Sequence, residues 1–309
     1  MKNIIVMSGD IGSGKSSVAE ALKQLTGFEV IGTGAIQRAI AKRRGLTTLE
    51  LNKISQTDRS IDDEIDSYVV ETGKTQDHLI LDSRLAWHFI PAAFKVFLSV
   101  DPVVGAERVF NASRSDENNP SLGATLENNL KRQAIEDQRF HKLYNVNFRK
   151  YGNYDLIIDT SFTSPEVIAG RIKDCFDKWL SHCPYSSLWI APKKLLPTQP
   201  IKAGTGTGYE LTDNGIQEHQ AIDVFVCNGF IYIWDGHKRT IAAHKAGCDL
   251  IPAKILTEEP ADELNPGLSA AELASGVSLS ILHDWEEALG FKYKIYPETG
   301  SFIDLALVK

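Results

Sequence analysis

The chain has 309 residues, of which 43% are hydrophobic and 24% are charged, so its composition is that of a soluble globular protein with room for about two domains. No apolar run approaches the ~20 residues of a membrane span, and the four cysteines form no CxxC pair, which argues against a membrane protein, a zinc site and a disulfide framework. The net charge of −7 arises after Leu256, where ten acidic residues outnumber three basic ones.

The first half of the chain alternates short apolar runs with helical patterns. This alternation is typical of an α/β fold, with a parallel sheet covered by helices on both faces. A glycine-rich loop follows the first strand too early for a signal peptide, so we expect a cytoplasmic protein. We expect strands at 3–9, 28–34, 78–82, 93–100 and 154–159, and helices at 16–25, 35–45, 60–73 and 165–182, with long polar helices between 100 and 154.

The second half begins near Pro184, where prolines and then glycines and threonines accumulate. Residues 221–236 predict a β-hairpin, because Asn228-Gly229 suits a two-residue type I′ turn. A helix, one more strand, an acidic linker over 257–267, and a final helix with a terminal hairpin are expected to follow. We therefore divide the chain into an α/β domain at 1–183, a smaller α+β domain at 184–258 and an acidic extension at 259–309.

A phosphate-binding loop is the clearest motif. Gly9-x4-Gly14-Lys15-Ser16 matches GxxxxGK[ST] between a predicted strand and a predicted helix. Its backbone N–H groups and the helix N-terminus favour phosphate, while Lys15 is suited to the β- and γ-phosphates of ATP and Ser16 to Mg²⁺. The expected cofactor-binding residues are Gly9, Asp10, Ile11, Gly12, Ser13, Gly14, Lys15, Ser16 and Ser17.

Three aspartates stand at positions of interest. Asp82 ends a predicted strand, at the sheet edge where open α/β sheets bind ligands. Asp82 could act as a magnesium ligand, as a general base for an acceptor hydroxyl, or as a helix cap. For Asp159, at the end of another strand, we prefer a helix-capping role. Asp10 lies inside the phosphate loop, where it would contact the acceptor, orient a water molecule or point outward.

Taken together, these segments resemble the cytidylate kinase family, in its short archaeal-type branch. The resemblance covers about Met1 to Phe176 and rests on GDIGSGKSS, IGTGAIQRAIAKRRGLTTLELN, IDDEID, LDSRLA, RQAIEDQRFHKLYN and YDLIIDTSFTSPEVI, in that order. It implies a nucleoside-monophosphate-kinase fold with a five-stranded parallel sheet, a lid between Arg108 and Arg132, and Mg-ATP as donor. It places Arg38 and Arg84 near the acceptor, and Arg132 and Arg139 near the transferred phosphate.

The region from Ser187 to Leu256 resembles the ParB/sulfiredoxin superfamily, through LWIAPKKLLPTQPI and VFVCNGFIYIWDGHKRTIAAHKAGCDLIPAKIL. The resemblance implies a second phosphate-binding turn, formed by Asp235, Gly236, His237, Lys238 and Arg239.

The fusion of these two parts is similar to bacteriophage kinases that phosphorylate 5-hydroxymethyluracil in DNA. That resemblance makes DNA the expected partner, with Asp82 as the base. The expected catalytic residues are Lys15, Asp82, Arg132 and Arg139. Three alternatives stay open: a kinase for free CMP, dCMP or a related nucleotide, a nucleotide-gated DNA-binding switch, and a small-molecule kinase whose active site is the second domain.

Overall fold

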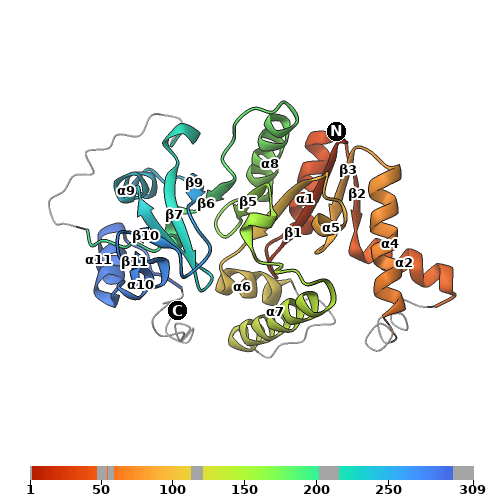
Figure 1. Cartoon of the computed structure of the whole chain (residues 1–309), viewed down its shortest axis with the longest axis horizontal. Coiled ribbons are helices and arrows are strands. Elements are labelled where there is room, and N and C mark those ends of the chain that lie inside the picture. The colour runs from red at the N-terminus through yellow and green to blue at the C-terminus, as the bar shows by residue number, and fades with distance from the viewer. Residues whose placement is uncertain (1, 47–53, 55–58, 113–120, 202–215, 295–309) are drawn as a thin grey trace.

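The computed structural model describes residues 2–46, 54, 59–112, 121–201 and 216–294. Its main feature is a nine-stranded sheet in the order β2-β3-β1-β4-β5-β6-β9-β7-β8, which runs through both halves of the chain (Figure 1). No helix among the described residues is long and apolar enough to cross a membrane.

Five parallel strands form the first part of this sheet, as the sequence predicts. Because they are parallel, their carboxyl ends meet at one edge, which is where the phosphate loop leaves β1. The strands are β1 (Ile4–Gly9), β2 (Glu29–Gly32), β3 (Leu79–Asp82), β4 (Phe94–Ser99) and β5 (Leu156–Asp159).

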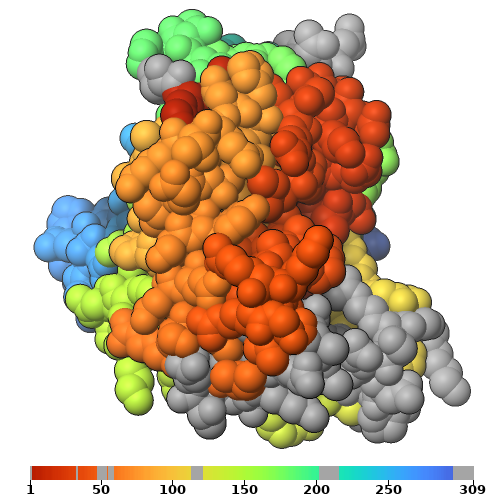
Figure 2. All heavy atoms as spheres, turned by 90° about the vertical axis from the view of Figure 1, so that its right-hand side faces the viewer, coloured from red at the N-terminus to blue at the C-terminus, as the bar shows by residue number. Residues whose placement is uncertain are grey.

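Helices cover both faces of these strands, which also confirms the prediction. On one face α1 (Lys15–Thr26) and α8 (Pro165–Leu180) bury one apolar cluster, and on the other α2 (Thr33–Arg44), α4 (Ser60–Thr75) and α5 (Ala86–Phe89) bury another. Figure 2 shows α2 and α4 side by side on the surface. The remaining helices, α6 (Pro102–Asn111) and α7 (Leu122–Tyr144), pack on each other through Val103, Ala106 and Leu126.

The second half continues the same sheet. Strand β6 (Leu188–Ile190) pairs in parallel with β5, and β9 (Ile251–Ile255) joins it antiparallel. The predicted hairpin is confirmed as β7 (Ile222–Cys227) and β8 (Phe230–Asp235), with Asn228 at φ 51° and Gly229 at φ 81°, as a type I′ turn requires. Helix α9 (His237–Lys245) follows, and 3₁₀ turns stand at η1 (Tyr151–Asn153), η2 (Pro192–Lys194) and η3 (Glu218–Gln220).

The acidic segment after β9 is not a linker, so that prediction is wrong. The Glu258 carboxylate accepts hydrogen bonds from the Tyr151 and Gly152 N–H groups at 2.6 and 2.7 Å, and β10 (Glu263–Asn265) pairs with β11 (Leu268–Ser269). Helices α10 (Ala270–Ser275) and α11 (Leu279–Leu289) join the main core through buried Ala270 and Trp285. The expected terminal hairpin lies outside the described residues.

The proposed boundary between residues 183 and 184 falls between α8 and β6. One apolar cluster contains buried residues from 1–183, from 184–258 and from the extension. The three-part division of the chain stays a prediction.

Candidate active site

The phosphate loop connects β1 to α1 in a conformation that needs glycine. Gly9 has φ 152°, and a Cβ atom there would lie 2.3 Å from the Leu98 carbonyl oxygen. Gly12 has φ 79°, and its Cβ would lie 2.3 Å from the Gly105 carbonyl oxygen. The loop therefore lies directly on β4 and α6. Helix α1 begins at Lys15 with no acidic residue in its first turn, so the positive end of its dipole is open to an anion.

The loop forms one wall of a cleft of about 1020 Å³. Two buried hydroxyls in its lining, Ser13 Oγ and Thr163 Oγ1, have no hydrogen-bond partner among the described residues, which indicates a polar ligand. Most residues that the sequence singles out line this cleft: Ile11, Gly12, Ser13, Gly14, Lys15, Ser16, Ser17, Arg38, Asp82, Arg84 and Arg132.

Lys15 lines the cleft and is partly buried. Its ammonium group donates to the carbonyl oxygens of Gly9 and Asp10, at 3.1 and 3.2 Å. Burial, with a smaller contribution from the nearby charge of Arg84, lowers the pKa of Lys15 to about 8, and the carboxylates of Asp82 and Asp10 oppose that shift. Phosphate oxygens bound beside Lys15 would add negative charge to its surroundings and favour its charged form.

We expect nucleotide affinity to fall with rising pH above about 8. Phosphate binding raises the pKa of Lys15, so at higher pH the protein must take up a proton to bind, and affinity drops by at most about tenfold per pH unit. Calorimetric titration with ADP in two buffers of different ionisation enthalpy would measure this uptake. The pH dependence should vanish in Lys15→Met, and a flat affinity between about pH 7 and 9.5 in the unmodified protein would contradict the assignment.

Asp82 lies beside Ser16. Its Oδ2 accepts a hydrogen bond from the Ser16 hydroxyl at 3.4 Å, and its backbone pairs with Met7 and Gly32 of the adjacent strands. Burial raises the pKa of Asp82, while the charges of Lys15 and Arg84 and the Ser16 hydroxyl oppose this. The cap of α5 is Leu85, so the helix-cap alternative for Asp82 is wrong.

A serine hydroxyl and a carboxylate fit magnesium, which takes oxygen ligands and uses few of them from the protein. Within the described ranges no cluster of three or more His, Cys, Asp or Glu residues is placed to hold a metal.

The four predicted arginines separate into two groups. Arg38, Arg84 and Arg132 line the cleft, and burial followed by the charge of Arg132 lowers the pKa of Arg84 to about 10. Arg84 pairs with the α7 residue Glu136. Arg139 is not among the residues that line the cleft and instead binds Asp62 of α4, so the structure does not bring it to the phosphate loop.

Two further arginines, which the sequence does not single out, hold the loop in place. Arg108, at the end of α6, donates to the carbonyl oxygens of Gly12 and Thr160, at 3.3 and 2.6 Å. Arg149 pairs with Asp10, whose other oxygen accepts from the Val100 N–H at 3.0 Å. Asp10 therefore braces the loop through its side chain and does not point outward.

Asp159 does not cap α8, and that prediction is wrong because Ser164 holds the capping position. Asp159 is instead fully buried and forms an ion pair with Lys194 of η2.

The predicted second phosphate turn, Asp235–Arg239, leads from β8 into α9. The Arg239 guanidinium donates to the Gln220 and Ala221 carbonyl oxygens and binds Asp235. His237 accepts from the Thr198 N–H, and burial lowers its pKa to about 4, so its ring is neutral. These side chains are engaged within the protein, and a phosphate-binding role for the turn stays a prediction.

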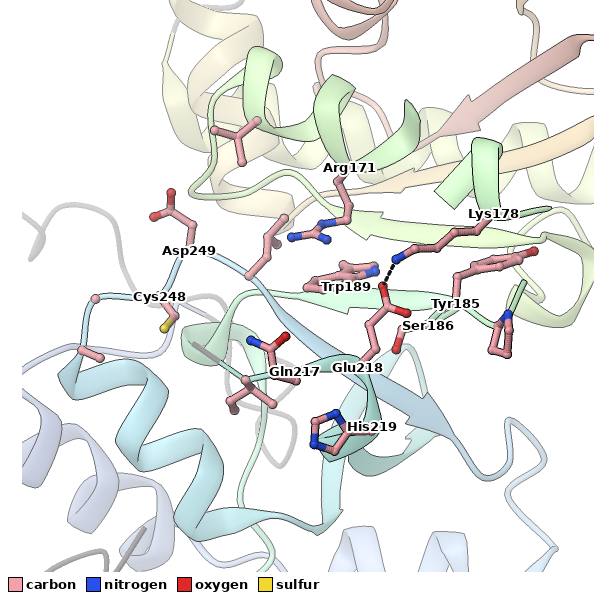
Figure 3. A pocket seen from close by; sticks show the side chains of 16 residues that line it. Arg171, Lys178, Tyr185, Ser186, Trp189, Gln217, Glu218, His219, Cys248 and Asp249 are labelled. Atoms are coloured by element: carbon pink, nitrogen blue, oxygen red, sulfur yellow. Dashed lines mark hydrogen bonds and ion pairs between the residues drawn. The ribbon is translucent and has the colours of Figure 1, made fainter. Parts of the chain in front are cut away.

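A separate cavity of about 900 Å³ lies between α8 and the second half (Figure 3). Arg171 stacks over the Trp189 ring at 3.6 Å, and Lys178 binds Glu218 at 3.0 Å. With Asp249 also in its lining, acidic and basic side chains balance there, and the lining does not single out a ligand of one charge.

Comparison with known proteins gives matches to the part of the chain that carries the cleft. A family model described as an AAA domain matches residues 5–134. The chain is 36% identical over 175 residues to the cytidylate kinase of Methanocella arvoryzae, a match that covers 57% of this chain and 97% of that protein. For the cytidylate kinase of Natronomonas pharaonis the identity is 33%, over 57% of this chain and 90% of the relative.

A third relative has a different architecture. The chain is 33% identical over 179 residues to an S-adenosylmethionine-dependent nucleotide dehydratase of Lacinutrix mariniflava, which covers 58% of this chain and 37% of that protein. In all three comparisons more than two fifths of the present chain lies outside the match.

Proposed function

Through its P-loop domain the chain belongs to the cytidylate kinase family, and from that premise we propose that it transfers the γ-phosphate of Mg-ATP to the phosphate of a free nucleoside monophosphate of the cytidylate type. That the chain is a P-loop kinase follows from the family itself. The identity of the acceptor is the proposal.

The position of Asp82 is the observation that carries it. An acceptor alcohol needs a general base, whereas an acceptor phosphate is already an anion and needs mainly cations. Asp82 is hydrogen-bonded to Ser16, the residue suited to hold magnesium, and three arginines line the same cleft. This arrangement supports a role for Asp82 as a magnesium ligand and an acceptor that carries negative charge.

In this mechanism an acceptor phosphate oxygen attacks the γ-phosphorus of ATP while the bond from that phosphorus to the β-bridging oxygen breaks, which releases ADP. Lys15 and the N–H groups of the loop hold the β- and γ-phosphates. Arg84 and Arg132 neutralise the transferred group, and Arg38 orients the acceptor. Ser16 and Asp82 would hold magnesium, which would supply further charge neutralisation.

We expect Asp82→Asn to lower turnover on the order of 10²-fold at limiting magnesium and to recover much of it when magnesium is raised. The amide keeps one oxygen ligand but loses the charge that holds the metal. Steady-state kinetics over a magnesium series would measure this, with Asp177→Asn, an exposed partner of Lys173 on α8, as the control. A loss that magnesium does not repair would identify Asp82 as a general base and contradict the proposed acceptor.

The second candidate is phosphorylation of the hydroxymethyl group of 5-hydroxymethyluracil in DNA. The observation that favours it is the second half of the chain, which lies beyond the length of the matched cytidylate kinases and adds four strands to the kinase sheet. A kinase for free nucleotides does not require this part, whereas a kinase acting on DNA could use it to bind the duplex. In that case Asp82 would be the base, and the modified nucleotide would leave the base stack at a cost of a few kcal/mol.

A further inference from the structure

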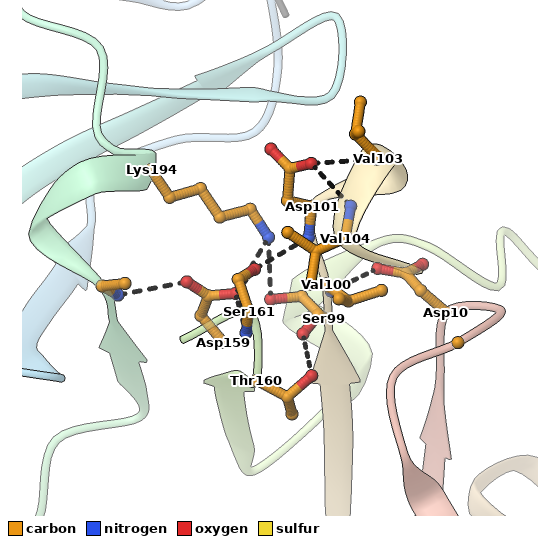
Figure 4. A network of polar contacts seen from close by, with 12 residues as sticks. Asp10, Ser99, Val100, Asp101, Val103, Val104, Asp159, Thr160, Ser161 and Lys194 are labelled. Carbon is orange, nitrogen blue, oxygen red and sulfur yellow. Dashed lines mark hydrogen bonds and ion pairs between the residues drawn. The ribbon is translucent and has the colours of Figure 1, made fainter. Parts of the chain in front are cut away.

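A lysine from the second half reaches the carboxyl edge of the kinase sheet. Lys194 of η2 donates to the Ser99 hydroxyl at 3.2 Å and lies 3.4 Å from Asp159 Oδ1 (Figure 4). The Ala191 N–H donates to the other oxygen of Asp159 at 3.2 Å. Two residues of the second half therefore satisfy a carboxylate that is fully buried in the first.

Lys194 is the ion-pair partner of this carboxylate. Burial would lower the pKa of Lys194, but Asp159, and after it Tyr151, Asp10 and Asp101, outweigh burial and raise that pKa above its ordinary value. Lys194 therefore stays charged. Without Lys194, Asp159 would lose its ion-pair partner and keep only the more distant charge of Arg108. Removing one partner of a buried ion pair is strongly destabilising.

Asp159 in turn orders a wall of the nucleotide cleft. Its Oδ1 accepts from the backbone N–H and the hydroxyl of Ser161, at 3.1 and 2.5 Å, and the Ser161 hydroxyl accepts from the Asp101 N–H at 2.8 Å. Arg108 binds the carbonyl oxygens of Thr160 and Ser161. Thr160 lines the cleft, so the chain of contacts from Lys194 ends at the site itself.

Lys194 also binds the residue next to the one that holds Asp10 of the phosphate loop. Ser99, which accepts from Lys194, precedes Val100, whose N–H donates to Asp10 in the loop. Two further lysines from outside the kinase match approach neighbouring elements. Lys193 lies over the Phe162 ring at 5.7 Å, and Lys294 binds Glu107 of α6 at 2.9 Å.

We propose that Lys194 is a positioning residue for the donor nucleotide. By neutralising Asp159 it holds the 159–161 turn and the phosphate loop in the geometry that binds ATP, so the second half of the chain completes the donor site. This role for Lys194 rests on the proposed function only because it requires the cleft to bind ATP. It does not depend on which acceptor is phosphorylated.

The test compares Lys194→Met with Lys173→Met, which breaks an exposed ion pair on α8. We expect Lys194→Met to raise the KM for ATP about tenfold and leave the KM for the acceptor unchanged, while Lys173→Met changes neither. Adding Asp159→Asn to Lys194→Met should restore part of the ATP affinity. The buried charge is then gone and the amide oxygen still accepts from Ser161, while the Ala191 N–H loses its carboxylate acceptor. An unchanged KM for ATP in a folded Lys194→Met protein, or a double variant no better than the single one, overturns the proposal.

Hydrogen exchange in the unmodified full chain gives a second test that does not depend on how the variants fold. A non-hydrolysable ATP analogue with magnesium should slow amide exchange in 160–164 and also in 191–195, because coupling between two sites is reciprocal. Protection of 160–164 without any change in 191–195 overturns the role of Lys194. Failure of the analogue to protect the phosphate loop at all would instead count against the proposed kinase function.

Discussion

Replacing Lys15 by alanine is expected to lower phosphoryl transfer by about 10³-fold or more. The transferred group carries its charge on oxygens that the protein must neutralise, and Lys15 is the partly buried cation at the end of the phosphate loop. Transfer of labelled γ-phosphate from ATP, measured in single turnover, would separate this loss from any change in product release.

The matched control is Lys23→Ala, in the last turn of the same helix. Lys23 is exposed and its nearest acidic partner is Glu20 at 3.9 Å. Lys23→Ala therefore changes the net charge by the same amount as Lys15→Ala and leaves the cleft unchanged. Substantial turnover in Lys15→Ala would mean that the phosphate loop does not perform the transfer.

A chain ending at Cys183 is expected to melt well below the full chain. Truncation removes β6 from the edge of β5 and deprives buried Asp159 of Lys194 and the Ala191 N–H. Breaking a buried ion pair costs about 3–5 kcal/mol, which for a domain of this size corresponds to a fall of about 6–20 °C in melting temperature. Differential scanning calorimetry of both chains would measure it.

Asp159→Asn in the truncated chain provides the control for this explanation. If an uncompensated carboxylate causes the loss, the amide should recover a large part of the melting temperature. A 1–183 fragment that melts within about 2 °C of the full chain and binds ATP equally well would show that the second half is an independent appendage.

Local sequence signals predicted the local structure of the site. The glycine spacing and Lys15-Ser16 predicted the phosphate loop. Its backbone needs glycine because Gly9 and Gly12 adopt positive φ angles against neighbouring backbone atoms. The Asn228-Gly229 turn was likewise predictable, since its two positive φ angles follow from those residue types.

What the sequence could not reveal depends on contacts between distant segments. Lys194 and Asp159 are 35 positions apart, and their pairing depends on where three-residue β6 docks, which no periodicity indicates. Arg108 and Arg149 look like ordinary surface residues in the sequence, and only the fold brings them to Gly12 and Asp10. An aspartate after a strand commonly caps the next helix, but Asp159 is buried beside η2 and forms an ion pair with Lys194 instead.

The central claim is that this P-loop kinase phosphorylates a free nucleoside monophosphate. A γ-labelled ATP transfer assay with two sets of acceptors tests it most directly: the free ribo- and deoxynucleoside monophosphates, and duplex DNA containing 5-hydroxymethyluracil beside unmodified DNA. We predict label in CMP or dCMP and none in either DNA. Label in the modified DNA alone would contradict the claim, make Asp82 the candidate base, and assign the second half of the chain to binding the substrate.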